Sequence, residues 1–131
     1  MQNPQNLEIW RRSIELAVDI TAMARSISGL DAPGLANQIR RASSSIPANI
    51  AEGVGHNTPK ETARFLSIAI ASAFELESHL ILIGRLDPSI VECDRLLDEL
   101  RQIRRMTYSY RRHKMQESEK QKRRRDDRPA S

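Results

Sequence analysis

The chain has 131 residues and a mass of 14.9 kDa, which is enough for one domain. Aromatic residues make up only 4 % of it, too few for a surface on which nucleic-acid bases stack. The net charge of +4 is unevenly distributed, because residues 101–131 contain 12 Lys and Arg against 4 Asp and Glu, whereas acids outnumber bases before residue 101. The basic C-terminal part indicates a polyanionic partner.

Cysteine and histidine usage argues against a metal site. Cys93 is the single cysteine, so an internal disulfide is impossible, and the three histidines lie far apart in sequence. We expect no metal and no cofactor. No run of about 18 uninterrupted apolar residues occurs, and the first residues do not resemble a secretory leader, so we expect a cytoplasmic protein without a membrane span.

The first half of the chain predicts two helices. Apolar residues recur at helical spacing over residues 7–27, with Arg11 and Arg12 on the opposite face. Glycine and proline at residues 28–34 break this pattern. A second helix is predicted over residues 35–52, with Pro47 inside it, and glycines follow its end.

The second half predicts two more helices and a tail. Thr58, Pro59 and Glu61 form a capping pattern that begins a third helix over residues 58–85, apolar almost all round. Asp87 and Pro88 begin a fourth helix in the same way, over residues 88–116. Residues 117–131 contain almost nothing to bury, so we predict a disordered basic tail. Short connections predict an all-α, up-down-up-down antiparallel four-helix bundle over residues 1–116.

Two segments carry a resemblance to a known family. The run from Gln38 to Gly53, QIRRASSSIPANIAEG, resembles the signature of a bacterial four-helix-bundle family, the 23S rRNA intervening-sequence proteins. The run from Phe65 to Glu77 is similar to that family's second motif. The resemblance implies kinship with the accessory variability proteins of diversity-generating retroelements, and with it a homopentameric ring that binds nucleic acid and partners a reverse transcriptase. The basic tail is absent from the family pattern.

A polar stripe lies beside the apolar face of the second predicted helix. Steps of four, four and three residues place its members, Arg41, Ser45, Asn49 and Glu52, on one side. We interpret the stripe as structural, with Asn49 and Ser45 satisfying backbone groups near Pro47. If Glu75 is buried in the third helix, it needs a partner, and Arg41 is a candidate. The alternative is a polar contact site for nucleic acid or a small ligand.

A basic surface is predicted on the fourth helix. Its members recur on a common side and have no acid one turn away between the first and the last: Arg101, Arg104, Arg105, Arg111, Arg112 and Lys114. Such a row can follow a phosphate backbone. The alternative is a solvated face that only keeps the protein soluble.

These patterns favour a non-enzymatic, oligomeric protein that binds RNA or DNA through phosphates, without sequence preference. No nucleophile, positioned histidine or metal set accompanies the paired Arg and Glu, so we expect no enzyme. The alternative is a structural scaffold or protein-interaction module that does not bind nucleic acid.

Overall fold

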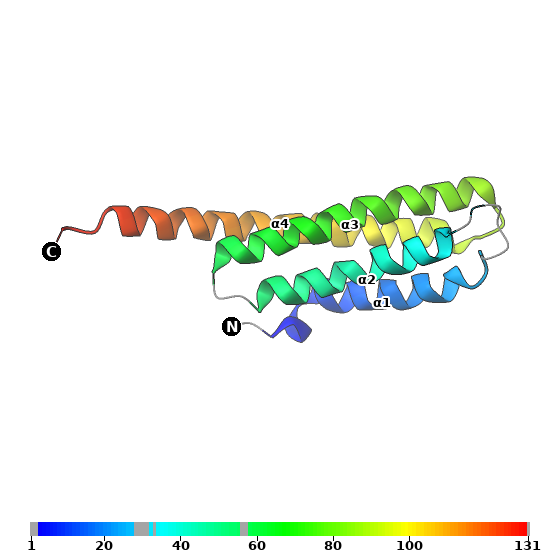
Figure 1. The fold of residues 1–131 in the computed structure, drawn as a ribbon, viewed down its shortest axis with the longest axis horizontal. Helices are drawn as coiled ribbons and strands as arrows, with labels where there is room; N and C mark the ends of the chain where they lie inside the picture. Colours follow the sequence, from blue (N-terminus) through cyan, green and yellow to red (C-terminus); the bar gives the residue numbers. More distant parts are fainter. Residues whose placement is uncertain (1–2, 28–31, 33, 56–57, 131) are drawn as a thin grey trace.

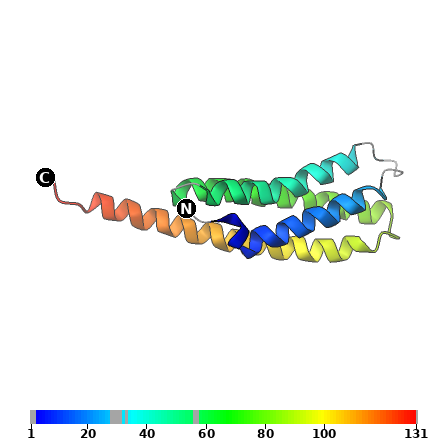
Figure 2. The same ribbon diagram turned by 90° about the horizontal axis from the view of Figure 1, so that it is seen from below.

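The chain forms four long helices, as the apolar periodicity predicts. The computed structural model describes residues 3–27, 32, 34–55 and 58–130. A short 3-10 helix, η1 (Pro4–Asn6), precedes α1 (Glu8–Ala24), α2 (Leu35–Val54), α3 (Pro59–Leu86) and α4 (Glu92–Asp126). Successive helices run in opposite directions, which confirms the antiparallel four-helix bundle (Figure 1, Figure 2). The predicted break at residues 28–34 lies mostly outside the described residues.

The core lies along the shared axis of the bundle. Helix α3 packs against α2 and α4, and α1 packs against both α2 and α4. Every helix contributes large side chains that are almost completely buried, including Leu16, Ile20, Ile39, Ile50, Leu66, Leu76, Leu100 and Ile103. Burying one such side chain stabilises the fold by roughly 1.5–3 kcal/mol, so this shared core holds the helices together.

Helix α3 is apolar on its outer face as well as its inner one. Ile68, Phe74, Ile81 and Leu82 are all exposed. By length and composition alone α3 could cross a membrane, since its best 18-residue window has a mean hydropathy of 1.6, with 33 % of that window buried. A helix packed between two neighbours has the same composition, and α3 occupies that position in the bundle.

The two predicted helix starts have different outcomes. Thr58 caps α3, because its side-chain hydroxyl accepts a hydrogen bond from the Glu61 N–H at 3.2 Å. The start predicted at Asp87 and Pro88 is wrong, since α4 begins at Glu92. Asp87 accepts a hydrogen bond from the Ser89 N–H at 3.1 Å and so stabilises the preceding turn instead.

Most of the tail that we predicted to be disordered is helical in the structure. Helix α4 continues through residues 117–126 as an exposed rod that projects beyond the other three helices (Figure 1). This segment has no apolar core to join, but it consists largely of Glu, Gln, Lys and Arg, which are good helix formers. Extending an existing helix avoids the cost of nucleation, and the cations in the last turn suit the helix dipole.

Helices α2 and α3 approach each other closely at Gly53, within the signature segment. A Cβ atom at this position would lie 3.0 Å from the Phe65 Cβ and 3.1 Å from the Thr62 carbonyl oxygen. The Thr62 hydroxyl also donates a 2.7 Å hydrogen bond to the Gly53 carbonyl. A side chain at this position would force a neighbour to move by a few tenths of an ångström, so glycine favours this close approach.

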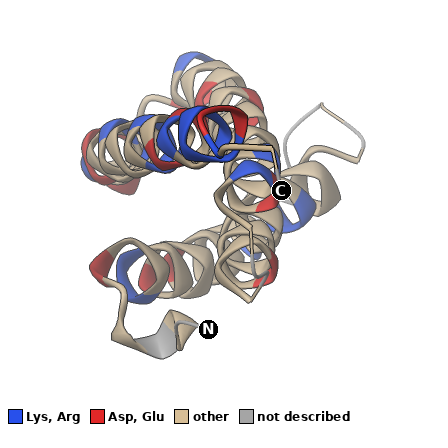
Figure 3. Cartoon of the chain, turned by 90° about the vertical axis from the view of Figure 1, so that its left-hand side faces the viewer, with Lys and Arg blue, Asp and Glu red and all other residues tan. Residues whose placement is uncertain are grey.

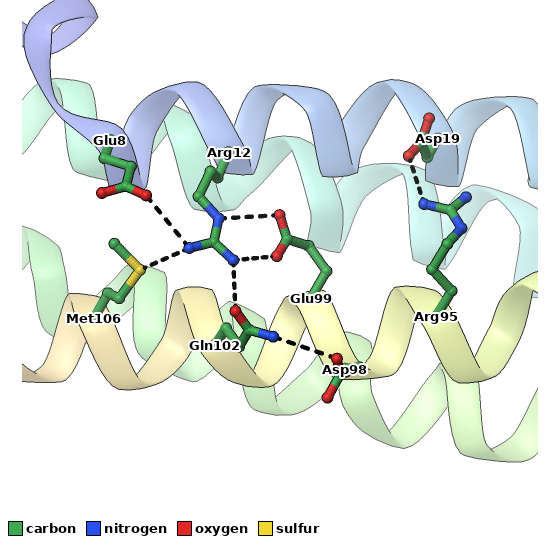
Figure 4. Close-up of polar contacts among 8 residues, drawn as sticks. All are labelled: Glu8, Arg12, Asp19, Arg95, Asp98, Glu99, Gln102 and Met106. Atoms are coloured by element: carbon green, nitrogen blue, oxygen red, sulfur yellow. Dashed lines mark hydrogen bonds and ion pairs between the residues drawn. The ribbon is translucent and has the colours of Figure 1, made fainter.

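Arg12 joins α1 to α4 through polar contacts (Figure 4). Its guanidinium donates to both carboxylate oxygens of Glu99, with Nε at 3.1 Å from Oε2, and its Nη2 lies 2.8 Å from Gln102 Oε1. Arg95 and Asp19 form a second α1–α4 ion pair, at 3.2 Å. The hydrogen bonds to Glu99 favour the charged guanidinium and raise the pKa of Arg12.

Candidate nucleic-acid interface

The structure divides the predicted basic surface of α4 into paired and unpaired side chains. Arg101 Nε and Arg104 Nη1 both contact Glu77 Oε2, at 3.1 Å and 2.9 Å. The Arg104 guanidinium also lies over the Phe74 ring, 4.3 Å from its centroid. The expectation of uncompensated charge is therefore wrong for these two arginines, because the compensating acid comes from α3 and not from α4.

Two further cations of this surface also contact other side chains. Arg111 Nε donates a 2.6 Å hydrogen bond to the Ser67 hydroxyl of α3. Lys114 Nζ lies 3.4 Å from Glu117 Oε2 and 5.4 Å from the Tyr110 ring centroid. Arg111 therefore contacts a neutral hydroxyl, whereas Lys114 contacts a carboxylate.

Arg105 and Arg112 remain available. Both are exposed, and within the part of the chain that the structure describes neither makes a hydrogen bond or an ion pair. They lie seven residues apart, two helical turns, on one side of α4. Of the six predicted phosphate ligands, these two fit the role without first breaking another contact.

More cations follow along the projecting part of α4. This segment carries an exposed group of unpaired cations among the described residues, namely Lys120, Lys122, Arg123, Arg124 and Arg125. They belong to the end of the molecule from which the C-terminus projects, the side that faces the viewer in Figure 3. The helix carries these charges around its circumference, so the basic part of the chain is a rod with cations on all sides.

The polar stripe of α2 is tied to its own backbone and to α3. Asn49 Nδ2 donates to the Ser45 carbonyl at 2.8 Å and to its hydroxyl at 3.0 Å. The Ser45 hydroxyl lies 2.8 Å from that of Ser72 on α3. Glu52 is exposed at the end of the stripe.

The suggested partnership between Arg41 and Glu75 does not form. The Glu75 side chain is 59 % exposed, so it needs no buried partner, and its carboxylate lies 3.6 Å from His79 Nε2. Arg41 is exposed at one side of a cleft of about 520 Å³ that both residues line. Tertiary packing turns Glu75 towards solvent, although apolar residues surround it in the sequence.

Cys93 is buried, and burial raises the pKa of its thiol.

Among the described residues, no group of three or more His, Cys, Asp and Glu side chains could hold a metal ion.

Sequence reasoning missed Glu77 as the partner of the α4 arginines, and it missed Lys60 and Arg64 at the beginning of α3. The signal for Glu77 was an acid within the apolar stretch of the predicted third helix, because a carboxylate in such a stretch is rarely buried unless it is paired. Lys60 and Arg64 carried no signal, because only the packing of α3 against α4 brings them near the basic end of α4.

The structure is thus an all-α, antiparallel four-helix bundle, with the signature segment on α2 and a basic α4. The profile of the family described as 23S rRNA-intervening sequence protein matches residues 5–109, and the chain belongs to this family. Its fold is similar to the crystal structure of a protein of unknown function from the S23 ribosomal protein family of Bacteroides thetaiotaomicron. The TM-score is 0.71 at 24 % identity, over 77 % of this chain and 95 % of the other. No curated protein matches the chain.

Proposed function

We propose that this chain is a non-enzymatic nucleic-acid-binding protein that contacts phosphates through α4. The observation that carries the proposal is the set of exposed, unpaired cations on α4, from Arg105 and Arg112 to the projecting segment. Like charges held along one helix repel one another, and a polyanion relieves this repulsion. Phosphate oxygens match guanidinium groups in geometry as well as charge.

Binding of this kind is largely independent of sequence. Its free energy comes from the release of counterions from the nucleic acid, and few side chains on α4 are suited to reading base edges. Tyr108 is the exposed aromatic residue of α4 that lies near the free arginines. RNA and DNA therefore both fit the proposal.

We further propose that the protein acts as a homo-oligomer. The exposed apolar side chains of α3, Ile68, Phe74, Ile81 and Leu82, support this, because a second copy would remove them from water. The number five and a reverse transcriptase as partner come from the family resemblance, as does kinship with retroelement accessory proteins. We also propose a cytoplasmic location, where a chain with a single cysteine needs no disulfide.

The alternative function is a scaffold or protein-interaction module. The outer face of α3 and the cleft beside Arg41 favour it, because an exposed apolar face and a cleft lined from α2 and α3 could dock another protein. In that case the charge on α4 serves only solubility.

Salt dependence separates the two functions. Fluorescence anisotropy with a labelled single-stranded RNA and a duplex DNA, over about 50 to 200 mM NaCl, should show binding that weakens steeply as salt increases. Each phosphate contact contributes about −0.9 to the slope of log K against log salt on duplex DNA, and about −0.7 on single strands. Negligible binding even at the lowest salt would support the scaffold instead.

A further inference from the structure

A cleft of about 710 Å³ begins where the first turns of α3 lie beside α4 and continues along α4 onto its projecting part. One wall is formed by the beginning of α3 and includes Lys60, Arg64 and Ser67. The other wall belongs to α4 and runs from Arg111 past Met115 to Arg125. The hydrogen bond between Arg111 and Ser67, at 2.6 Å, joins the two walls at the inner end.

The cleft is strongly basic. Five cations line it, Lys60, Arg64, Arg111, Lys122 and Arg125, against two acids, Glu61 and Glu119. Glu61 is already paired with Arg64, at 3.2 Å. Lys60, Lys122 and Arg125 have no hydrogen-bond or ion-pair partner among the described residues.

We infer that this cleft holds the backbone of a single nucleic-acid strand, with Lys60 of α3 and Lys122 and Arg125 of α4 as its phosphate ligands. The inference rests on the proposed function and assigns its site to two helices. Cations that line one groove, first on α3 and then further along α4, can contact successive phosphates of one strand, as in grooves that track single strands.

The size of the cleft favours a strand over a duplex. Its volume lies within the roughly 300–1,000 Å³ of sites that enclose one small ligand, which suits a short stretch of one strand. A duplex, whose two grooves alone are about 12 and 6 Å wide, is too broad to enter such a site. Met115 adds exposed apolar surface within the cleft, against which a ribose or a base can rest without sequence preference.

The test compares two variants that each remove two positive charges. The first, Lys60→Gln with Lys122→Gln, changes one cation of the cleft from each helix. The control, Arg85→Gln with Arg95→Gln, changes exposed side chains near the end of α3 and the beginning of α4, at the opposite end of the bundle (Figure 1). The probes are a labelled 15-nucleotide oligo(U) and a duplex DNA of the same length, and circular dichroism checks that helicity is unchanged.

For oligo(U), the cleft variant should bind more weakly, with a salt slope shallower by about 1.4, while the control keeps the wild-type slope. If both variants shift the slope equally, the net charge decides binding and the cleft site is wrong. Equal losses on duplex and on oligo(U) would overturn the assignment to a single strand. A wild-type protein that binds neither probe would refute the proposed function itself, a result distinct from loss of the cleft site alone.

Discussion

Glu77 of α3 holds two arginines of α4 at once, with its Oε2 atom 3.1 Å from Arg101 Nε and 2.9 Å from Arg104 Nη1. The Glu77 side chain is only 19 % exposed. One half-buried carboxylate therefore pairs with two of the arginines that the sequence presents as equivalent. The same ion pairs link α3 to α4.

Replacing Glu77 by Gln should lower the free energy of unfolding by about 1–3 kcal/mol, because Arg104 would keep its charge without an ionic partner. Nucleic-acid affinity should not fall, since the change adds net positive charge to the basic face. Urea denaturation measures the first effect and anisotropy the second. Arg105→Gln is the control, and we expect it to change stability by less than about 0.5 kcal/mol. Weaker binding by the Glu77 variant would contradict the division of the basic surface.

Arg12→Ala should destabilise the bundle by about 1–3 kcal/mol, because it leaves the half-buried carboxylate of Glu99 without its fork-shaped donor. Arg12→Lys should recover only part of this loss, since an ammonium group cannot donate to both oxygens in the same geometry. Arg95→Ala removes the exposed pair with Asp19 and should cost less than about 1 kcal/mol. Equal effects of Arg12→Ala and Arg95→Ala on urea midpoints would show that the Arg12 contacts stabilise the fold no more than the exposed ion pair of Arg95 does.

The two helical glycines Gly53 and Gly84 should respond to alanine in opposite directions. At Gly53 the new Cβ would lie 3.0 Å from the Phe65 Cβ, so helix α2 or α3 must shift, at a cost of about 1–3 kcal/mol. At Gly84 the nearest atom, the Cys93 Cβ, would be 3.8 Å away, so the helix propensity of alanine should add up to about 1 kcal/mol of stability. Thermal melts of the two variants check both signs.

Asn49→Leu should lower stability by about 1–3 kcal/mol, because the Ser45 hydroxyl and carbonyl lose the side-chain donor that contacts both. Asn37→Leu is the control, since Asn37 is exposed and contacts only Arg40, also on the surface. An unchanged melting temperature for the Asn49 variant would favour the alternative reading of the stripe as a contact site.

Stability should fall as the pH rises above the ordinary thiol pKa of about 8.5. Burial raises the pKa of Cys93 in the folded chain, so at high pH the unfolded chain loses this proton first and gains stability relative to the fold. The contribution of Cys93 is fully present below the unfolded pKa. Urea denaturation at about pH 7.5 and pH 9.5 should show a smaller decrease for Cys93→Ala than for the wild type. An identical decrease in both would assign the effect to other groups.

The sequence by itself determined the helical content and the class of the fold. Apolar residues at helical spacing predicted four helices, and the Thr58 cap predicted the beginning of α3 correctly, because capping depends on residues three positions apart. The signature from Gln38 to Gly53 also predicted the family. These are local properties, which are readable in a short window of sequence.

Only the tertiary structure decided which charges are free. Arg104 and Arg105 are neighbours in sequence, yet one lies against Glu77 and Phe74 and the other is exposed. Helical spacing assigns a residue to a face, but the partner on that face belongs to another helix whose register the spacing does not specify. Lys60 and Lys122 illustrate the converse, since 62 positions separate two cations that the fold places on the walls of one cleft.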